Sequence, residues 1–151
     1  MPKPIATSTT AAVSRLAVEA FTIPTDAPES DGTLEWHATT IVVVHVTAGR
    51  ATGLGFTYGD VAVASIVDRV LAPQVIGRDA VDIEAAYVAM VHAVRNIGLQ
   101  GVAASAISAV DIAMWDAKAR LLDVPLVTLL PSGSGVTGAN RSRKYDRRPN
   151  A

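Results

Sequence analysis

The sequence contains no cysteine among its 151 residues, which excludes disulfide bonds, thiolate metal sites and a cysteine nucleophile. No segment approaches the roughly 18 consecutive apolar residues of a membrane-spanning helix. The N-terminal residues also lack the apolar run of a signal peptide. We therefore expect a cytoplasmic protein without a membrane partner.

The sequence has no excess of positive charge either. Its formal net charge is -1, which argues against a nucleic-acid partner. The charge is unevenly distributed, because 5 of the 13 Lys and Arg residues lie in the last eleven positions. The segment 131–151 is rich in glycine, serine and basic residues and has little to bury, so we expect a disordered basic tail there. We also expect residues 1–12 to form a disordered tail.

Hydrophobic residues make up 50% of the chain, enough for one folded domain, which we place at residues 13–130. Alternating or β-branched apolar residues predict three strands, at Val13–Ile23, Thr39–Thr47 and Ala51–Tyr58. Gly49 suits a tight turn between the last two strands. The segment Pro24–Glu35, with its prolines and carboxylates, is typical of a long loop.

After Gly59 the apolar spacing changes from two to about 3.6 residues, which indicates helices. Asp60 stands where a helix N-cap accepts backbone hydrogen bonds, and Pro73 is expected to end that helix. The predicted helices run from Val61 to about Leu71, from near Asp82 to Gly98, and from about Val102 to Leu122. The sequence thus predicts an α+β fold, a three-stranded antiparallel meander followed by about three helices.

Three stretches together resemble the N-terminal capping domain of the enolase superfamily, of the mandelate racemase and muconate lactonizing enzyme type. They are 42–60, which ends in Gly-Leu-Gly-Phe-Thr-Tyr-Gly-Asp, 71–79, and 106–118 followed by Pro-Leu-Val-Thr-Leu-Leu at 125–130. The third stretch is the most specific. The resemblance implies the same fold that the periodicity predicts.

In that family the capping domain closes over a (β/α)-barrel that removes a proton next to a substrate carboxylate. The resemblance implies that the divalent metal, Mg²⁺, and the base belong to the barrel, so this chain holds neither catalytic residues nor metal ligands and is inactive alone. It supplies two lid loops, at 25–36 and 53–59. The candidate residues for contact with a small carboxylate substrate are Asp26, Glu29, Asp31, Trp36, Phe56, Thr57 and Tyr58. For Phe56 we favour a structural role instead, in which its ring packs the meander against the helices.

The sequence departs from the family pattern after Leu130, where a glycine and the first barrel strand are expected. Pro-Ser-Gly-Ser-Gly and the basic tail follow instead. A barrel typically needs about 250 residues. A truncation or a frameshift that puts 131–151 out of frame would explain the difference.

Other candidate groups favour structural roles. Asp111 and Asp116 are five positions apart on a helix, so their carboxylates point about 140° apart and share a metal poorly. Asp116 and Arg120 are spaced for an ion pair. His37 and His45, two of the three histidines, lie about 26 Å apart on an extended strand, too far for a shared metal.

Two alternative functions remain open. The glycines of 53–59 resemble a phosphate-binding loop, but their G-x-G-x-x-x-G spacing and the acidic Asp60 do not suit a nucleotide. A free-standing module for protein interaction is the stronger alternative. An apolar face left uncovered would associate with a partner or form a homo-oligomer.

Overall fold

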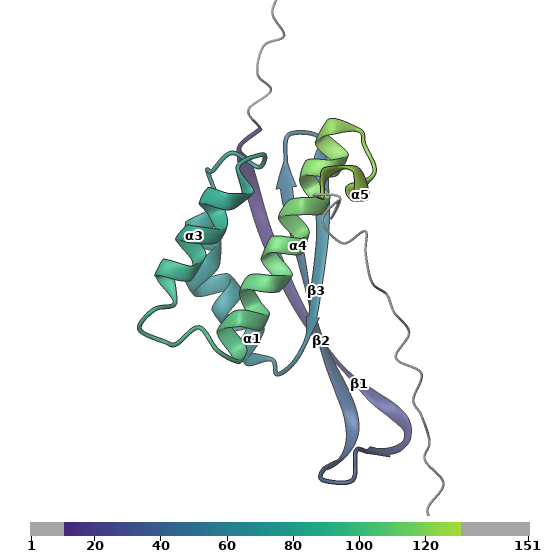
Figure 1. Ribbon diagram of the computed structural model, residues 1–151. Coiled ribbons are helices and arrows are strands. Elements are labelled where there is room, and N and C mark those ends of the chain that lie inside the picture. The colour runs from purple at the N-terminus through teal and green to yellow at the C-terminus, as the bar shows by residue number, and fades with distance from the viewer. Residues whose placement is uncertain (1–10, 131–151) are drawn as a thin grey trace, which may run out of the picture.

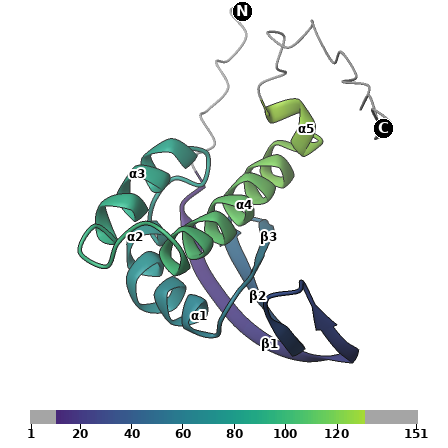
Figure 2. The ribbon, with the colours of Figure 1, turned by 60° about the horizontal axis from the view of Figure 1, so that its bottom comes forward.

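Three antiparallel strands in the order β1-β2-β3 form a sheet with helices on one face (Figures 1 and 2). The computed structural model describes residues 11–130. The strands are β1 (Val13–Ser30), β2 (Glu35–Ala48) and β3 (Ala51–Tyr58). Ala48 pairs with Ala51 across the two-residue turn at Gly49, where φ is +52°. The predicted meander is confirmed.

The sheet has one buried and one exposed face. Val42, Val44 and Val46 of β2 are fully buried and contribute to the core beneath the helices. The intervening residues of β2, such as Val43, point to the opposite face, which we call the outer face. No helix covers this face in the described part of the chain (Figure 2).

The predicted long loop at 24–35 is wrong. β1 continues to Ser30 and β2 begins at Glu35, so the two strands form a hairpin that extends beyond the helices (Figure 1). Pro24 pairs with Ala38, and after an irregularity in the ladder Glu29 pairs with Trp36. The prolines are tolerated because β1 has a neighbouring strand on one side only.

The first helical segment is continuous through three parts, α1 (Ala62–Ile66), η1 (Val67–Leu71) and α2 (Ala72–Val75). Asp60 Oδ1 accepts a hydrogen bond from the N–H of Ala62 at 2.8 Å and so stabilises the helix start. The expected end at Pro73 is wrong by one helical turn. Pro73 lies in the first turn of α2, directly after the wider π-helical turn. At this position the N–H group that proline lacks removes fewer helical hydrogen bonds than it would inside a regular helix.

The remaining helices are α3 (Ile83–Ala93), α4 (Val102–Leu122) and α5 (Leu126–Leu129). Asp82 caps α3 by accepting a hydrogen bond from the N–H of Ala85 at 3.1 Å. The bounds of α4 are those predicted, whereas α5 is too short to give a periodic signal. Among residues 11–130, no helix combines the length and apolarity that crossing a membrane requires.

Ala11 and Ala12, which we expected in a disordered tail, are held by the loop after α2. The N–H of Ala80 donates to the carbonyl oxygen of Ala11 at 2.9 Å, and Ala12 forms a β-bridge with Asp79. The expectation is therefore wrong for these two residues. The rest of that segment and the predicted basic tail at 131–151 lie outside the described residues.

α4 lies directly on β3, backbone against backbone, at two glycines. A Cβ atom added to Gly53 would lie 2.1 Å from the carbonyl oxygen of Ala113, and one added to Gly55 would lie 2.0 Å from that of Ala109. No side chain fits in this space. The glycine pattern of 53–59 therefore serves helix packing within a strand and is not a loop that could surround a phosphate.

We expect Gly55→Ala to lower the free energy of unfolding by about 3 kcal/mol, because the new methyl group must displace the backbone of α4. Urea denaturation followed by circular dichroism measures the change. Gly59→Ala is the matched control, since its Cβ would meet only the Cγ2 of Val63, at 3.2 Å, and a side chain can move. Equal stability of the two variants would contradict this account of the packing.

Candidate functional site

The projecting part of the β1–β2 hairpin, residues 24–38, carries four of the predicted lid residues, and we call it the arm. Glu29 and Trp36 form a cross-strand pair, and the indole N–H of Trp36 donates to Glu29 Oε2 at 3.0 Å. This bond fixes both side chains near the end of the arm. The indole ring remains partly accessible, so Trp36 offers an apolar surface in a defined orientation.

The tip of the arm is closed by Asp31. One carboxylate oxygen accepts hydrogen bonds from the N–H of Thr33 at 2.9 Å, the hydroxyl of Thr33 at 2.7 Å and the N–H of Leu34 at 3.0 Å. The hydroxyl of Thr33, followed by the two backbone N–H groups, lowers the pKa of Asp31 below its ordinary value of 3.8. This carboxylate is occupied by its own turn, which favours a structural role over contact with a substrate.

Asp26 lies in the irregular part of β1 between Pro24 and Glu29, and its side chain is exposed. The neighbouring Thr25 is partly buried, and its hydroxyl has no hydrogen-bond partner among the described residues. The ladder is interrupted here, so this segment of the arm is less constrained than the strands on either side of it.

Phe56 and Tyr58 form an aromatic pair at the end of β3. Their ring centroids are 6.1 Å apart and the ring planes are nearly perpendicular, at 82°. The two residues are 47% and 63% exposed. Phe56 pairs with Val43, so it lies on the outer face and does not pack against the helices, which corrects the alternative considered for it.

The seven candidate residues do not form one cluster. Thr57 pairs with the buried Val42, so it points to the helix side of the sheet, whereas Tyr58 pairs with Ile41 on the outer face. Trp36 precedes Ile41 by five residues on β2, a distance of about 17 Å along the strand. The structure brings together Glu29 with Trp36, and Phe56 with Tyr58, as two separate groups.

The acidic pair of α4 has structural surroundings. The predicted ion pair is present, with Arg120 Nε 2.8 Å from Asp116 Oδ2. The same oxygen accepts a hydrogen bond from the N–H of Leu54 at 2.9 Å, a contact across 62 positions that no local sequence signal indicates. Asp111 lies apart from it beside Tyr87 and Ser108, where desolvation raises the pKa of its carboxyl above 3.8.

Residues 11–130 hold no group of three or more His, Asp or Glu side chains that could bind a metal ion. Nε2 of His37 lies 3.4 Å from a carboxylate oxygen of Glu35, in an exposed pair. His45 lies with Arg15 and Glu19 on the outer face. The described residues therefore do not fit the Mg²⁺ that the family resemblance associates with the barrel.

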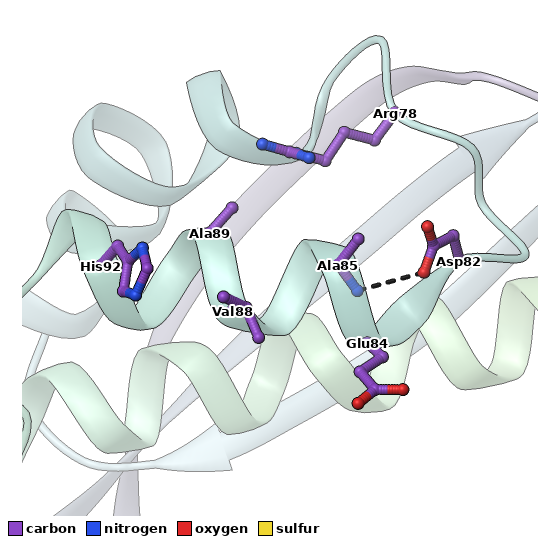
Figure 3. Close-up of a pocket in the computed structure, with 7 residues that line it drawn as sticks. All are labelled: Arg78, Asp82, Glu84, Ala85, Val88, Ala89 and His92. Atoms are coloured by element: carbon purple, nitrogen blue, oxygen red, sulfur yellow. Dashed lines mark hydrogen bonds between the residues drawn. The ribbon is translucent and has the colours of Figure 1, made fainter.

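A depression of about 510 Å³ along α3 is also unsuited to catalysis (Figure 3). Asp82 is engaged at the helix start, and Arg78 donates to the carbonyl oxygen of Gln74. Glu84 and His92 are attached to different turns and do not converge on one point (Figure 3). The depression is a solvated helix surface.

The chain belongs to the mandelate racemase and muconate lactonizing enzyme family. Residues 17–131 match the family's N-terminal domain. The three-stranded sheet followed by helices is the arrangement of that domain in the enolase superfamily. Family and fold are therefore those that the sequence predicts.

Similar proteins of known structure or function include isomerases and lyases. The chain is 46% identical, over 80 residues, to 3,6-anhydro-alpha-L-galactonate cycloisomerase of Streptomyces coelicolor; the match covers 50% of this chain and 22% of that protein. A mandelate racemase/muconate lactonizing enzyme-like protein of Rubrobacter xylanophilus is 52% identical, with a TM-score of 0.77, over 80% of this chain and 33% of that one.

An L-talarate/galactarate dehydratase of Salmonella typhimurium, solved with Mg and L-lyxarohydroxamate, is 25% identical with a TM-score of 0.72. The match covers 87% of this chain and 36% of that one. The chain thus spans between about a fifth and about a third of the length of these three relatives.

We expect Asp111→Asn to raise the melting temperature at neutral pH. The pKa of Asp111 is raised in the folded state, so its ionised form opposes folding, and this cost is present at neutral pH and disappears as the pH falls below about 3.8. Thermal denaturation of both proteins between pH 3 and 7 checks the gain and its disappearance.

Asp26→Asn, at an exposed position, is the control for this pH dependence and should leave the melting temperature nearly unchanged. A lower melting temperature of Asp111→Asn at neutral pH would show that the carboxylate is needed where it lies, contrary to the desolvation argument.

Proposed function

We propose that this domain is the substrate-capping lid of an enzyme of the mandelate racemase and muconate lactonizing type. In the full-length enzyme a barrel would remove a proton alpha to a substrate carboxylate, and the lid would exclude water and select the side group of the substrate. The observation that carries the proposal is the arm, an ordered hairpin that extends beyond the helical layer (Figure 1).

The arm has the properties that a lid requires. Its tip is ordered by the three hydrogen bonds of Asp31 and by the Trp36–Glu29 bond, so little conformational entropy is lost when it closes on a ligand. Its side chains are largely exposed, which leaves them free to contact a second surface. A hairpin that served only stability would bury one of its faces.

The second contact region would be the aromatic pair Phe56–Tyr58. Aromatic rings give shape to a pocket, and the phenol group of Tyr58 adds a hydrogen-bonding group. Thr57, on the helix side, would support the strand end and not touch the substrate. Together, Trp36 and Tyr58 are the residues through which we expect the lid to affect specificity.

The family relatives support a class of reaction for the full-length enzyme. They include a cycloisomerase and a dehydratase, and the dehydratase was solved with Mg. We infer a small carboxylate substrate and an isomerase, dehydratase or cycloisomerase reaction for the full-length enzyme. Because the described residues do not fit a metal, metal and base would both belong to the barrel, and this chain alone would be inactive.

A protein-interaction module is the alternative function. The exposed apolar residues of the outer face, which include Phe21, Ile23, Leu54, Phe56 and Tyr58, favour it. The same residues would serve the lid if a barrel covered part of this face. The two functions can be distinguished, because only the lid function requires Trp36 and Tyr58 for catalysis in the full-length enzyme.

A chimeric enzyme tests the lid function directly. The N-terminal domain of the Streptomyces coelicolor cycloisomerase would be replaced by residues 11–130, and turnover of 3,6-anhydro-alpha-L-galactonate measured. In this chimera we expect Trp36→Ala and Tyr58→Ala each to lower kcat/KM by about tenfold, because a misplaced substrate loses reactivity steeply. Their effects should differ between this substrate and other sugar acids.

Tyr87→Ala is the matched control, because Tyr87 is 45% exposed on α3, away from both groups. It should leave kcat/KM unchanged. An active chimera whose kcat/KM is unaffected by Trp36→Ala and Tyr58→Ala would contradict the lid function. Turnover by the 151-residue chain alone would contradict its proposed inactivity.

A further inference from the structure

One stretch of the sheet edge, residues 16–22 of β1, offers backbone groups for pairing. Ala48 pairs with Ala51 across the two-residue turn, so alternate residues of β2, from Thr47 downward, direct their N–H and C=O groups to β1. Their partners on β1 are the odd-numbered residues from Arg15 onward. The outward backbone N–H and C=O groups, which point away from the sheet, are therefore those of Leu16, Val18, Ala20 and Thr22.

Several other parts of the sheet edge are protected. On β3, the outward N–H of Leu54 donates to Asp116. At the start of β1, Val13 donates to Arg78 at 2.8 Å and accepts from Gly77 at 2.9 Å. In the arm, Pro24 and Pro28 have no N–H to offer. Natural proteins normally protect such edges, and among the described residues no backbone hydrogen bond occupies the outward groups of 16–22.

Space for an additional strand exists beside this edge. A groove of about 550 Å³ runs between residues 15–19 of β1 and the helical segment α1–η1, with Ser65, Asp68 and Arg69 on its far wall. α1 lies beside β1, which reaches the boundary of the molecule toward the arm (Figure 2). The groove is open to solvent along the edge, so an extended chain can approach it.

The charges on β1 identify the occupant as a second copy of this chain. Arg15 and Glu19 point to the same face, two residues to either side of Ala17. If two copies of β1 pair antiparallel about Ala17, Arg15 lies opposite Glu19 of the second copy, twice by symmetry. Leu16 then lies opposite Val18, and both have outward backbone groups, as the hydrogen-bonding pattern requires.

The neighbouring register is less favourable. Pairing about Val18 would place Arg15 opposite Phe21 and Glu19 opposite Ala17, which leaves four charges without partners. The groove wall adds Asp68 and Arg69, so the surface around the edge has no net charge that would repel a copy. We propose that two copies join through β1, antiparallel about Ala17, into a continuous six-stranded sheet.

Charge reversal tests the register. Sedimentation velocity of the full 151-residue chain from micromolar to millimolar concentration should show a monomer–dimer equilibrium. Arg15→Glu and Glu19→Arg should each raise the dimer dissociation constant about tenfold or more, because each creates two like-charged cross-strand pairs. The double variant, with the charges exchanged, should restore the dissociation constant of the original chain.

Arg95→Glu, an exposed reversal outside the groove, is the control and should leave the dissociation constant unchanged. Both Arg15 and Glu19 are exposed, so their variants should fold, which circular dichroism verifies. A chain that stays monomeric over the whole range overturns the proposal. A dimer that resists both reversals but dissociates on Tyr58→Asp also overturns it, in favour of association through the apolar outer face.

Discussion

The contact between α4 and β3 is the constraint on which the rest of the structure depends. Backbone lies against backbone at Gly53 and Gly55, with Ala109, Ala113 and Ala117 of α4 directly above. Such an approach requires small residues on both sides, and the alanine-rich sequence of α4 provides them. Because α4 is fixed on β3 in this way, the valines of β2 face a closed core, and the carboxylate of Asp116 reaches the edge of β3.

From this fixed centre the molecule divides into two parts with different physical character. Near α4 the sheet is covered, and the helix-facing valines of β2 are fully buried. Toward the arm the helices end, and the strands are held by each other and by side-chain hydrogen bonds such as that of Trp36 to Glu29. The proposed lid thus extends from a rigid support, as a site that must be positioned accurately requires.

Much of the fold could be predicted from local sequence patterns. The buried valine run of β2 and the long periodic segment of α4 have strong signals, and both elements are found where expected. The arm was missed because strands without a buried face have no alternation of apolar and polar residues, and its prolines resemble those of a loop. The continuation of the first helix through Pro73 was missed because a π turn has no sequence signature.

The two segments that carry the candidate site could be predicted from the sequence, but the spatial arrangement of their side chains could not. The sequence assigned Trp36 and Tyr58 to the same function. The face of the sheet on which a strand residue lies depends on the register, however, and the register depends on where each strand begins. The pairing of Thr57 with Val42 and of Tyr58 with Ile41 settles which side chains share a face. The contact of Asp116 with Leu54 depends on the position of α4, which only the assembled fold determines.

The exposure of the arm has a consequence for how this protein can change over evolutionary time. Substitutions at exposed positions such as Asp26 cost little stability, usually within about 0.5 kcal/mol, whereas a single added methyl group at Gly55 is costly. Mutations can therefore accumulate in the arm without unfolding the domain. Marginal stability limits the variants that most proteins can sample. Here the segment in which substitutions reduce stability least is also the one proposed to contact the substrate. New specificities can therefore arise while the scaffold stays the same.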